Sequence, residues 1–167
     1  MREKEYGIWQ AISWADMAAL VEHLACGLHQ AGLRRGEHMV VIGANRPRLY
    51  ATMLAVQALG AVPIALYQDA AAPECVFPLN NADVRFAFAE DQEQVDKLLE
   101  IREQCPQISN VYFDDPRGLR SYDEPGLAAL DELIAAGKAF AGIHTDFFKT
   151  EVDKVRPDDV AAMFFTS

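Results

Sequence analysis

The sequence is short of positive charge. Its 167 residues include 15 Lys and Arg against 25 Asp and Glu, which gives a formal net charge of −10 at pH 7. The only tight groups of basic residues are Arg34 with Arg35 and Arg46 with Arg48. Phosphate backbones are bound through clustered Lys and Arg, so the sequence predicts no nucleic-acid partner. The excess acid is typical of a solvated surface that keeps a protein soluble.

Cysteine and histidine are too few and too scattered to build a covalent or metal framework. The three cysteines are Cys26, Cys75 and Cys105, and no two have Cys-x-x-Cys spacing. This argues against disulfides, a zinc site or an activated thiol and favours a reducing cytoplasm. His23 and His29 are six residues apart and therefore lie on different faces of a helix. The sequence thus predicts neither a catalytic cysteine nor a metal site.

The chain also lacks a long uninterrupted apolar segment. Residues 1–5 carry charge and no apolar signal region, so no secretory signal is expected. Residues 49–67 are almost free of charge, but Gly60 and Pro63 divide them. A membrane-spanning helix needs ~20 continuous apolar residues. We interpret the segment as a buried helix that turns into a buried strand.

A dinucleotide-binding fingerprint is missing as well. Residues 43–45 follow a predicted strand and precede a predicted helix, but Asn45 and Arg48 stand where the G-x-G-x-x-G spacing needs glycine. We predict instead that Asn45 caps the helix, with Pro47 in its first turn. Arg46 and Arg48 are then interpreted as surface charges at a helix start rather than phosphate ligands.

An acidic segment gives no metal site either. It contains Asp114, Asp115, Asp123 and Glu124, without the alternating spacing and glycine of a calcium loop. We interpret residues 114–126 as a solvated loop.

What the chain does contain is an alternation of helical and strand patterns. Strands are predicted at 39–42, 61–66, 85–89, 108–113 and 160–165. The first predicted helix starts at Ser13 and stops at Gly32, and the second starts at Asn45 and continues up to Gly60. Further helices are predicted at 73–81, 91–103, 127–136 and 146–155, and Gly137 is expected to end the helix at 127–136. This order is typical of an α/β fold around a mainly parallel sheet. With no internal repeat or domain boundary in sight, residues 1–167 are expected to form one domain.

The last predicted strand runs into Thr166 and Ser167, and an apolar strand that ends in hydroxyl residues resembles the entry to a phosphate-binding loop. Further segments support a resemblance to one known family. They are Trp9 together with residues 12–16, residues 24–28 together with residues 32–37, residues 41–47, and residues 54–62. In order and spacing they resemble the front part of the large N-terminal domain of AMP-forming acyl-CoA synthetases. In that family a Thr-Ser-Gly-Thr-Thr-Gly-x-Pro-Lys-Gly loop follows the strand. Segments 90–98 and 112–119 are most similar to the long-chain fatty-acid ligases.

The resemblance implies a ligase that activates a carboxylate with ATP and Mg²⁺ to an acyl-adenylate and then transfers the acyl group to CoA. It implies a phosphate-contacting role for Thr166 and Ser167 alone. The family's adenine pocket, magnesium-binding acid and catalytic lysine would all lie beyond residue 167, so no catalytic or metal-binding residue is expected here. We therefore expect 1–167 to be a single partial domain that lacks the family's C-terminal domain and is inactive alone.

For the parent enzyme, the expected partners are a long-chain fatty acid and CoA. We expect it in the cytoplasm, with peripheral membrane contact when it collects substrate. A sheet cut at an interior strand would expose an edge, and exposed edges favour self-association. Two alternatives stay open: a complete, non-enzymatic α/β binding module, and another adenylating enzyme such as an aryl-acid ligase or a peptide-synthetase adenylation domain.

Overall fold

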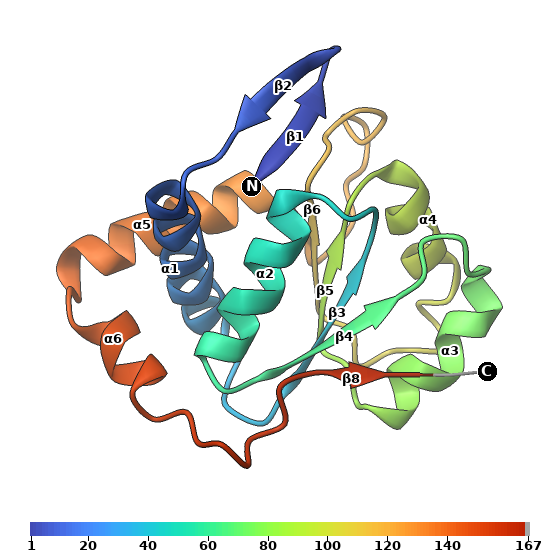
Figure 1. Ribbon diagram of the computed structural model, residues 1–167. Helices are drawn as coiled ribbons and strands as arrows, with labels where there is room; N and C mark the ends of the chain where they lie inside the picture. The colour runs from blue at the N-terminus through green and yellow to red at the C-terminus, as the bar shows by residue number, and fades with distance from the viewer. Residues whose placement is uncertain (166–167) are drawn as a thin grey trace.

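The computed structural model describes residues 1–165, and its centre is a six-stranded sheet (Figure 1). The strands are β1 (Arg2–Glu5), β2 (Ile8–Ala11), β3 (His38–Ile42), β4 (Val62–Leu66), β5 (Phe86–Ala89), β6 (Asn110–Phe113), β7 (Leu127–Ala129) and β8 (Met163–Phe164). The helices are α1 (Trp14–Ala31), α2 (Pro47–Ala58), α3 (Ala72–Asn81), α4 (Gln92–Glu100), α5 (Leu130–Ile143) and α6 (Phe147–Val152).

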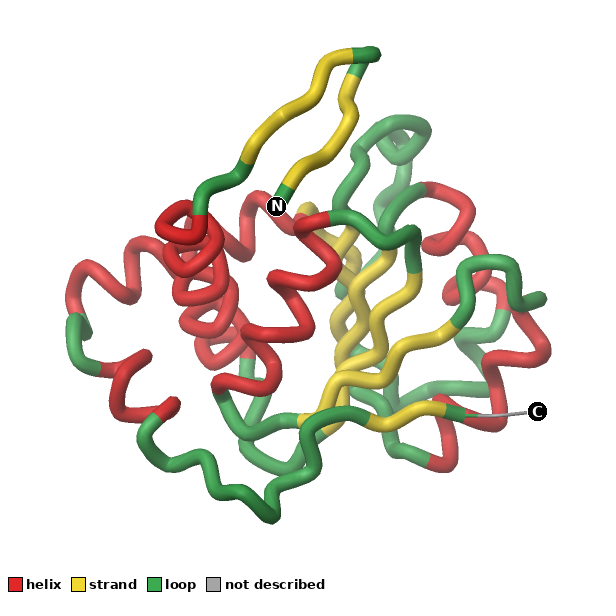
Figure 2. The backbone as a smooth tube through the Cα atoms, in the orientation of Figure 1, coloured by secondary structure: helices red, strands yellow, loops and turns green. Residues whose placement is uncertain are grey.

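The large sheet has the strand order β7-β6-β5-β3-β4-β8, and every neighbouring pair is parallel. The predicted α/β fold with a mainly parallel sheet is thereby confirmed. Figure 2 shows helices on both sides of this sheet. Their presence explains why the strands are continuous apolar runs, since a parallel sheet is buried on both faces.

The alternation of side chains along the central strands divides the core into two layers. In β5, Phe86 and Phe88 pack with α1, α2 and α5, whereas Ala87 and Ala89 face the layer of α3 and α4. Successive side chains of a strand point to opposite faces. The large phenylalanines therefore fill the layer that holds the longest helix.

The first helix starts and stops as the sequence predicts. The Ser13 hydroxyl accepts the backbone N–H of Asp16 at 3.1 Å, and the Asp16 carboxylate accepts the backbone N–H of Ser13 at 3.2 Å. This capping box satisfies two of the N–H groups that a helix start leaves without partners. Gly32 ends α1 at a φ of 105°, a left-handed conformation that suits glycine.

The helix predicted at 127–136 is partly wrong. Its first three residues form β7, which pairs in parallel with β6, and α5 starts only at Leu130. The predicted stop at Gly137 is also wrong, because α5 continues to Ile143. Gly137 is instead a point of close packing between α5 and α1.

The cap predicted at Asn45 is wrong by one residue. Arg46 is the N-cap of α2, with φ −104° and ψ 156°, and its side chain makes no capping bond. Arg46 precedes Pro47, and the proline ring disfavours the helical conformation for the residue before it. The turn therefore ends in an extended residue rather than in a polar cap.

A β-hairpin that the sequence did not predict precedes the domain. Strands β1 and β2 pair antiparallel and project from the body of the molecule (Figure 1). The uncharged stretch at 49–67 forms α2 and β4, as predicted. Every helix within residues 1–165 is too short or too polar to cross a lipid bilayer.

Candidate functional site

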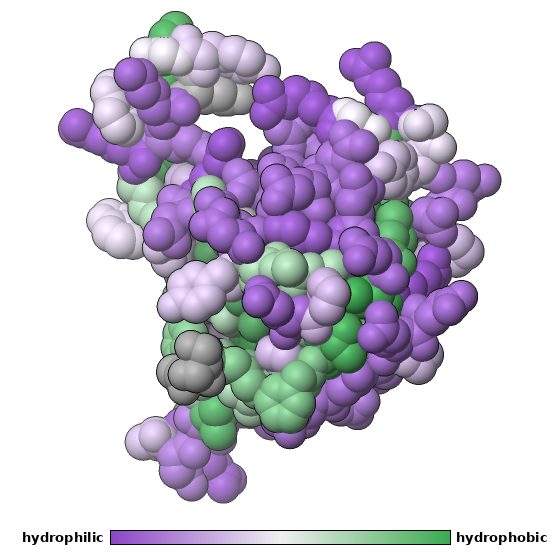
Figure 3. Space-filling view, turned by 90° about the vertical axis from the view of Figure 1, so that its right-hand side faces the viewer, coloured by the Kyte–Doolittle hydropathy of each residue, from purple (hydrophilic) through white to green (hydrophobic). Residues whose placement is uncertain are grey.

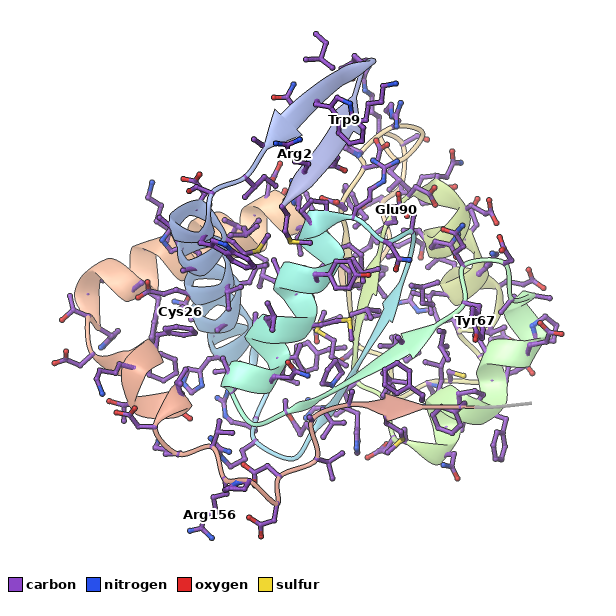
Figure 4. All side chains as sticks on the ribbon, in the orientation of Figure 1. Arg2, Trp9, Cys26, Tyr67, Glu90 and Arg156 are labelled. Carbon is purple, nitrogen blue, oxygen red and sulfur yellow. The ribbon has the colours of Figure 1, made fainter. Side chains whose placement is uncertain are left out.

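The carboxyl ends of the parallel strands meet at one edge of the sheet. The first residues beyond the strand ends are Gly43 after β3, Tyr67 after β4, Glu90 after β5, Asp114 after β6 and Phe165 after β8. In open α/β sheets, ligands bind at this edge. Figure 4 labels Glu90, which follows β5, and Tyr67, which follows β4 on the other side of β3.

A cavity of about 700 Å³ opens at this edge between α2 and the ends of β3, β4 and β8. Its walls are mainly apolar and include Leu49 and Met53 of α2 and Phe164 of β8. The polar rim comes from two loops and includes Asn45 and Asp69. A mostly apolar cavity of this size with a few polar groups is typical of a small-molecule site.

A second cavity, of about 560 Å³, lies beside α3 and shares Tyr67 and Phe165 with the first. The rings of Phe77 and Phe165 meet edge to face, with centroids 6.3 Å apart. Tyr67 and Phe77 are 82% and 69% exposed, so much of their apolar surface faces solvent. Figure 3 shows apolar side chains gathered on this side of the molecule.

The two residues predicted to contact phosphate, Thr166 and Ser167, lie outside the described residues. The strand predicted at 160–165 is confirmed in part: β8 comprises Met163 and Phe164 and pairs with β4. It is the outermost strand of the sheet, and Phe164 is 66% exposed. Self-association through this edge stays a prediction.

Between β3 and β5 the edge is closed by Glu90. Its carboxylate accepts the backbone N–H of Ala44 and lies 2.6 Å from Nε of Arg46. A Cβ on Gly43 would lie 2.6 Å from the Cβ of Glu90, so the turn has room only for glycine at that position. The space that a ligand could use therefore lies toward β4 and β8.

A partly buried ion pair lies next to Glu90. Nε of Arg48 lies 2.9 Å from Oδ1 of Asp114, and Nη2 of the same arginine lies 2.5 Å from Oδ1 of exposed Asp131. Burial raises the pKa of Asp114 to about 6, although Arg48 acts in the opposite direction. Arg48 is a surface charge, as interpreted from the sequence, and it is engaged in ion pairs. The interpretation as a solvated loop is wrong at Asp114, whose side chain is only 14% exposed.

The pKa of Asp114 predicts a loss of stability as the pH rises. Its folded-state pKa of about 6 is above the ordinary 3.8, so between these values the folded chain holds a proton that the unfolded chain has released. Stability from this group is full below pH ~4 and falls by up to about 3 kcal/mol as the pH passes 6. Asp114→Asn should remove this decline, as measured by urea unfolding at pH 4.5 and 7.5.

Its neighbour Asp115 provides a control of opposite sign. Hydrogen bonds from the exposed Arg117 hold the pKa of Asp115 below its usual value. The stability that these hydrogen bonds give to the folded chain is present above the ordinary pKa of Asp and is lost as the pH falls. Asp115→Asn should therefore be less stable than wild type at neutral pH. If both variants changed the pH profile in the same direction, the burial of Asp114 would not be the cause.

The three cysteine thiols are buried and unreactive. Burial raises the pKa of the Cys26 thiol to about 11 and also raises the pKa of Cys75 and Cys105. A raised pKa keeps a thiol protonated and unreactive. Within residues 1–165, no three His, Cys, Asp or Glu side chains are placed to hold a metal ion.

Sequence reasoning missed Glu90 and Asp114 as residues of this edge. Each comes directly after a predicted strand, at 85–89 and 108–113. Because parallel strands place their carboxyl ends together, that position was a usable signal. What the sequence could not indicate is their partners, which lie more than 40 positions away along the chain.

Comparison with known proteins relates this chain to one enzyme family. The family model described as "AMP-binding enzyme" matches residues 3–167. A long-chain-fatty-acid–CoA ligase of Mycobacterium bovis is 24% identical over 96% of this chain and 25% of its own length. The 4-coumarate–CoA ligase 4 of Arabidopsis thaliana is 25% identical over 93% of this chain and 26% of its own.

Among solved structures, coronafacic acid ligase from Pectobacterium brasiliense superimposes with a TM-score of 0.76 at 18% identity. The superposition covers 93% of this chain and 29% of that protein. At this identity the likeness concerns the fold. The chain spans about a quarter of the length of the two curated relatives.

Proposed function

Since this chain belongs to the AMP-binding enzyme family, we propose that it is the front part of the N-terminal domain of an acyl-CoA ligase. The observation that carries the proposal is the family match over residues 3–167. The resemblance drawn from segments such as 41–47 and 54–62 is thereby confirmed for the family. The division of the parent protein into this part and a C-terminal domain belongs to the proposal.

The proposed reaction joins a carboxylate to the α-phosphate of ATP, releases pyrophosphate, and then lets the CoA thiol displace AMP. Phosphoryl-type chemistry depends on positioning and charge neutralisation. Thr166 and Ser167 are proposed to donate hydroxyl hydrogen bonds to phosphate where the chain leaves β8. Within residues 1–165 no three His, Cys, Asp or Glu side chains are grouped to hold a metal ion, and no step is assigned here to Mg²⁺.

The substrate is proposed to be a long-chain fatty acid. The M. bovis relative and the similarity of residues 90–98 and 112–119 to fatty-acid ligases support this choice. The A. thaliana relative matches at nearly the same identity, which makes an aryl acid the second candidate. A cytoplasmic location, with the parent touching membranes as it collects its substrate, is part of the same proposal.

The first test is the coding sequence after Ser167. A continuation that encodes Gly-Thr-Thr-Gly-x-Pro-Lys supports the ligase. A stop codon there would favour the alternative of a non-enzymatic α/β module. Exchange of labelled pyrophosphate into ATP by the longer protein, with palmitate and 4-coumarate compared, then separates fatty from aryl acids.

In that longer protein, replacing Thr166 and Ser167 by alanine should slow pyrophosphate exchange. Each lost hydrogen bond to a charged phosphate is worth ~1.5–3 kcal/mol, so the loss of both should lower the rate roughly 10²- to 10⁴-fold. Ser109→Ala is the matched control, because Ser109 precedes β6 at the opposite edge of the sheet. Full activity in the double variant would show that neither hydroxyl contributes to the phosphate site.

A further inference from the structure

The β1–β2 hairpin carries apolar side chains that the domain does not cover. Figure 4 shows it standing away from the sheet and helices, with Arg2 and Trp9 labelled on it. Tyr6 at its turn is 88% exposed, Ile8 is 64% exposed and Trp9 is 65% exposed. Trp14, three residues after β2, is 79% exposed. Both tryptophans of the chain thus face solvent on this part of the surface.

The pairing of the two strands places positive charge beside the aromatic residues. Lys4 is opposite Trp9, and Arg2 is opposite Ala11. Residues directly opposite each other share a face of the hairpin. Glu3, on the other face, lies 3.5 Å from Arg46 of the domain. One face of the hairpin therefore presents two cations and an indole ring, although the whole chain is acidic.

We propose that this hairpin is a docking element for the surface of an anionic phospholipid bilayer. Tyrosine and tryptophan prefer the membrane–water interface because one part of each ring system is apolar and another part is polar. Arg2 and Lys4 match negatively charged headgroups, each with a free energy of ~1 kcal/mol near such a surface. The hairpin contains none of the residues proposed to contact phosphate, and the inference does not depend on the ligase assignment.

A lipid surface fits these residues better than other occupants. Nucleic acid is disfavoured because its phosphate backbone is bound through many clustered Lys and Arg, whereas this chain has a net charge of −10. A second copy of the chain would bring Arg2 and Lys4 against the same cations in an isologous pair, whereas anionic headgroups complement them. An isolated two-stranded hairpin is only marginally stable in water, so a bilayer would also stabilise the hairpin.

The test uses the intrinsic fluorescence of the chain with Trp14→Phe, in which Trp9 is the only tryptophan. On titration with vesicles of phosphatidylcholine and phosphatidylglycerol (7:3), the emission of Trp9 should shift to shorter wavelength. Pure phosphatidylcholine vesicles should bind at least tenfold more weakly. Arg2→Gln with Lys4→Gln should cost roughly tenfold or more in affinity for the anionic vesicles.

Sedimentation with the same vesicles supplies the controls. Trp9→Ser in the wild-type background should lose most vesicle binding, whereas Phe77→Ser, which changes a similarly exposed ring of α3, should not. Circular dichroism confirms that the variants remain folded. The proposal is overturned if wild type binds neither vesicle, if Trp9→Ser binds normally, or if the hairpin variants instead abolish a dimer seen by light scattering.

Discussion

Gly137→Ala is expected to lose ~3 kcal/mol or more of unfolding free energy, a value at the upper end of the range for overpacking a core. A Cβ at this position would lie 1.8 Å from the carbonyl oxygen of His23 and 2.6 Å from the backbone nitrogen of Gly27. Both atoms belong to the backbone of α1, which cannot move as a flexible side chain can. Gly27 has the same constraint, since a Cβ there would lie 2.4 Å from the carbonyl oxygen of Leu133.

Helix α5 contains its own control for this substitution. Gly142 lies in the same helix, and nothing comes within 4 Å of the position that its Cβ would take. Gly142→Ala should therefore stabilise the chain by up to about 1 kcal/mol through helix propensity alone. The two variants should separate clearly in urea unfolding followed by circular dichroism. Equal stabilities would show that α1 and α5 are not in backbone contact at Gly137.

The second large effect concerns activity: the 167-residue chain alone is expected to show no pyrophosphate exchange with ATP and palmitate. At the candidate edge, Arg46 and Arg48 are already engaged with Glu90 and Asp114. No cation of this group is free to neutralise a triphosphate, and neighbouring carboxylates would repel it. Catalysis of this kind requires such neutralisation.

The measurement is incorporation of labelled pyrophosphate into ATP, with 4-coumarate as a second acid. A blank without protein sets the background. Exchange above that background, removed by Thr166→Ala with Ser167→Ala, would place the complete catalytic machinery within 167 residues. It would also contradict the proposal that this chain is only the front part of the enzyme.

Local patterns predicted much of the fold because the forces behind them are local. The apolar run at 39–42 indicates a strand buried on both faces, and β3 lies at the centre of the sheet. Ser13 and Asp16 indicate a helix start through bonds that span three residues. β7 could not be predicted in this way, because three residues gain strand structure only by pairing with β6.

At the candidate site, too, local patterns predicted some features and missed those that depend on distant residues. The sequence predicts a mainly parallel sheet, and it draws attention to Thr166 and Ser167, whose role remains a proposal. It does not indicate that Glu90 would accept the N–H of Ala44, or that Asp114 would be buried against Arg48. Those contacts depend on strand order, since β3 and β5 are neighbours although β4 lies between them in the sequence.

For this protein the amino-acid sequence alone determined the α/β class and most helix and strand positions, because periodicity, capping and turn residues act over a few positions. The family followed from the resemblance of whole segments to known ligases. Only the tertiary structure decided that Gly137 lets two helices touch instead of ending one. It also decided which charges are solvated and where the apolar cavities open. These properties arise from contacts between distant segments, where burial changes the energy of the same side chain.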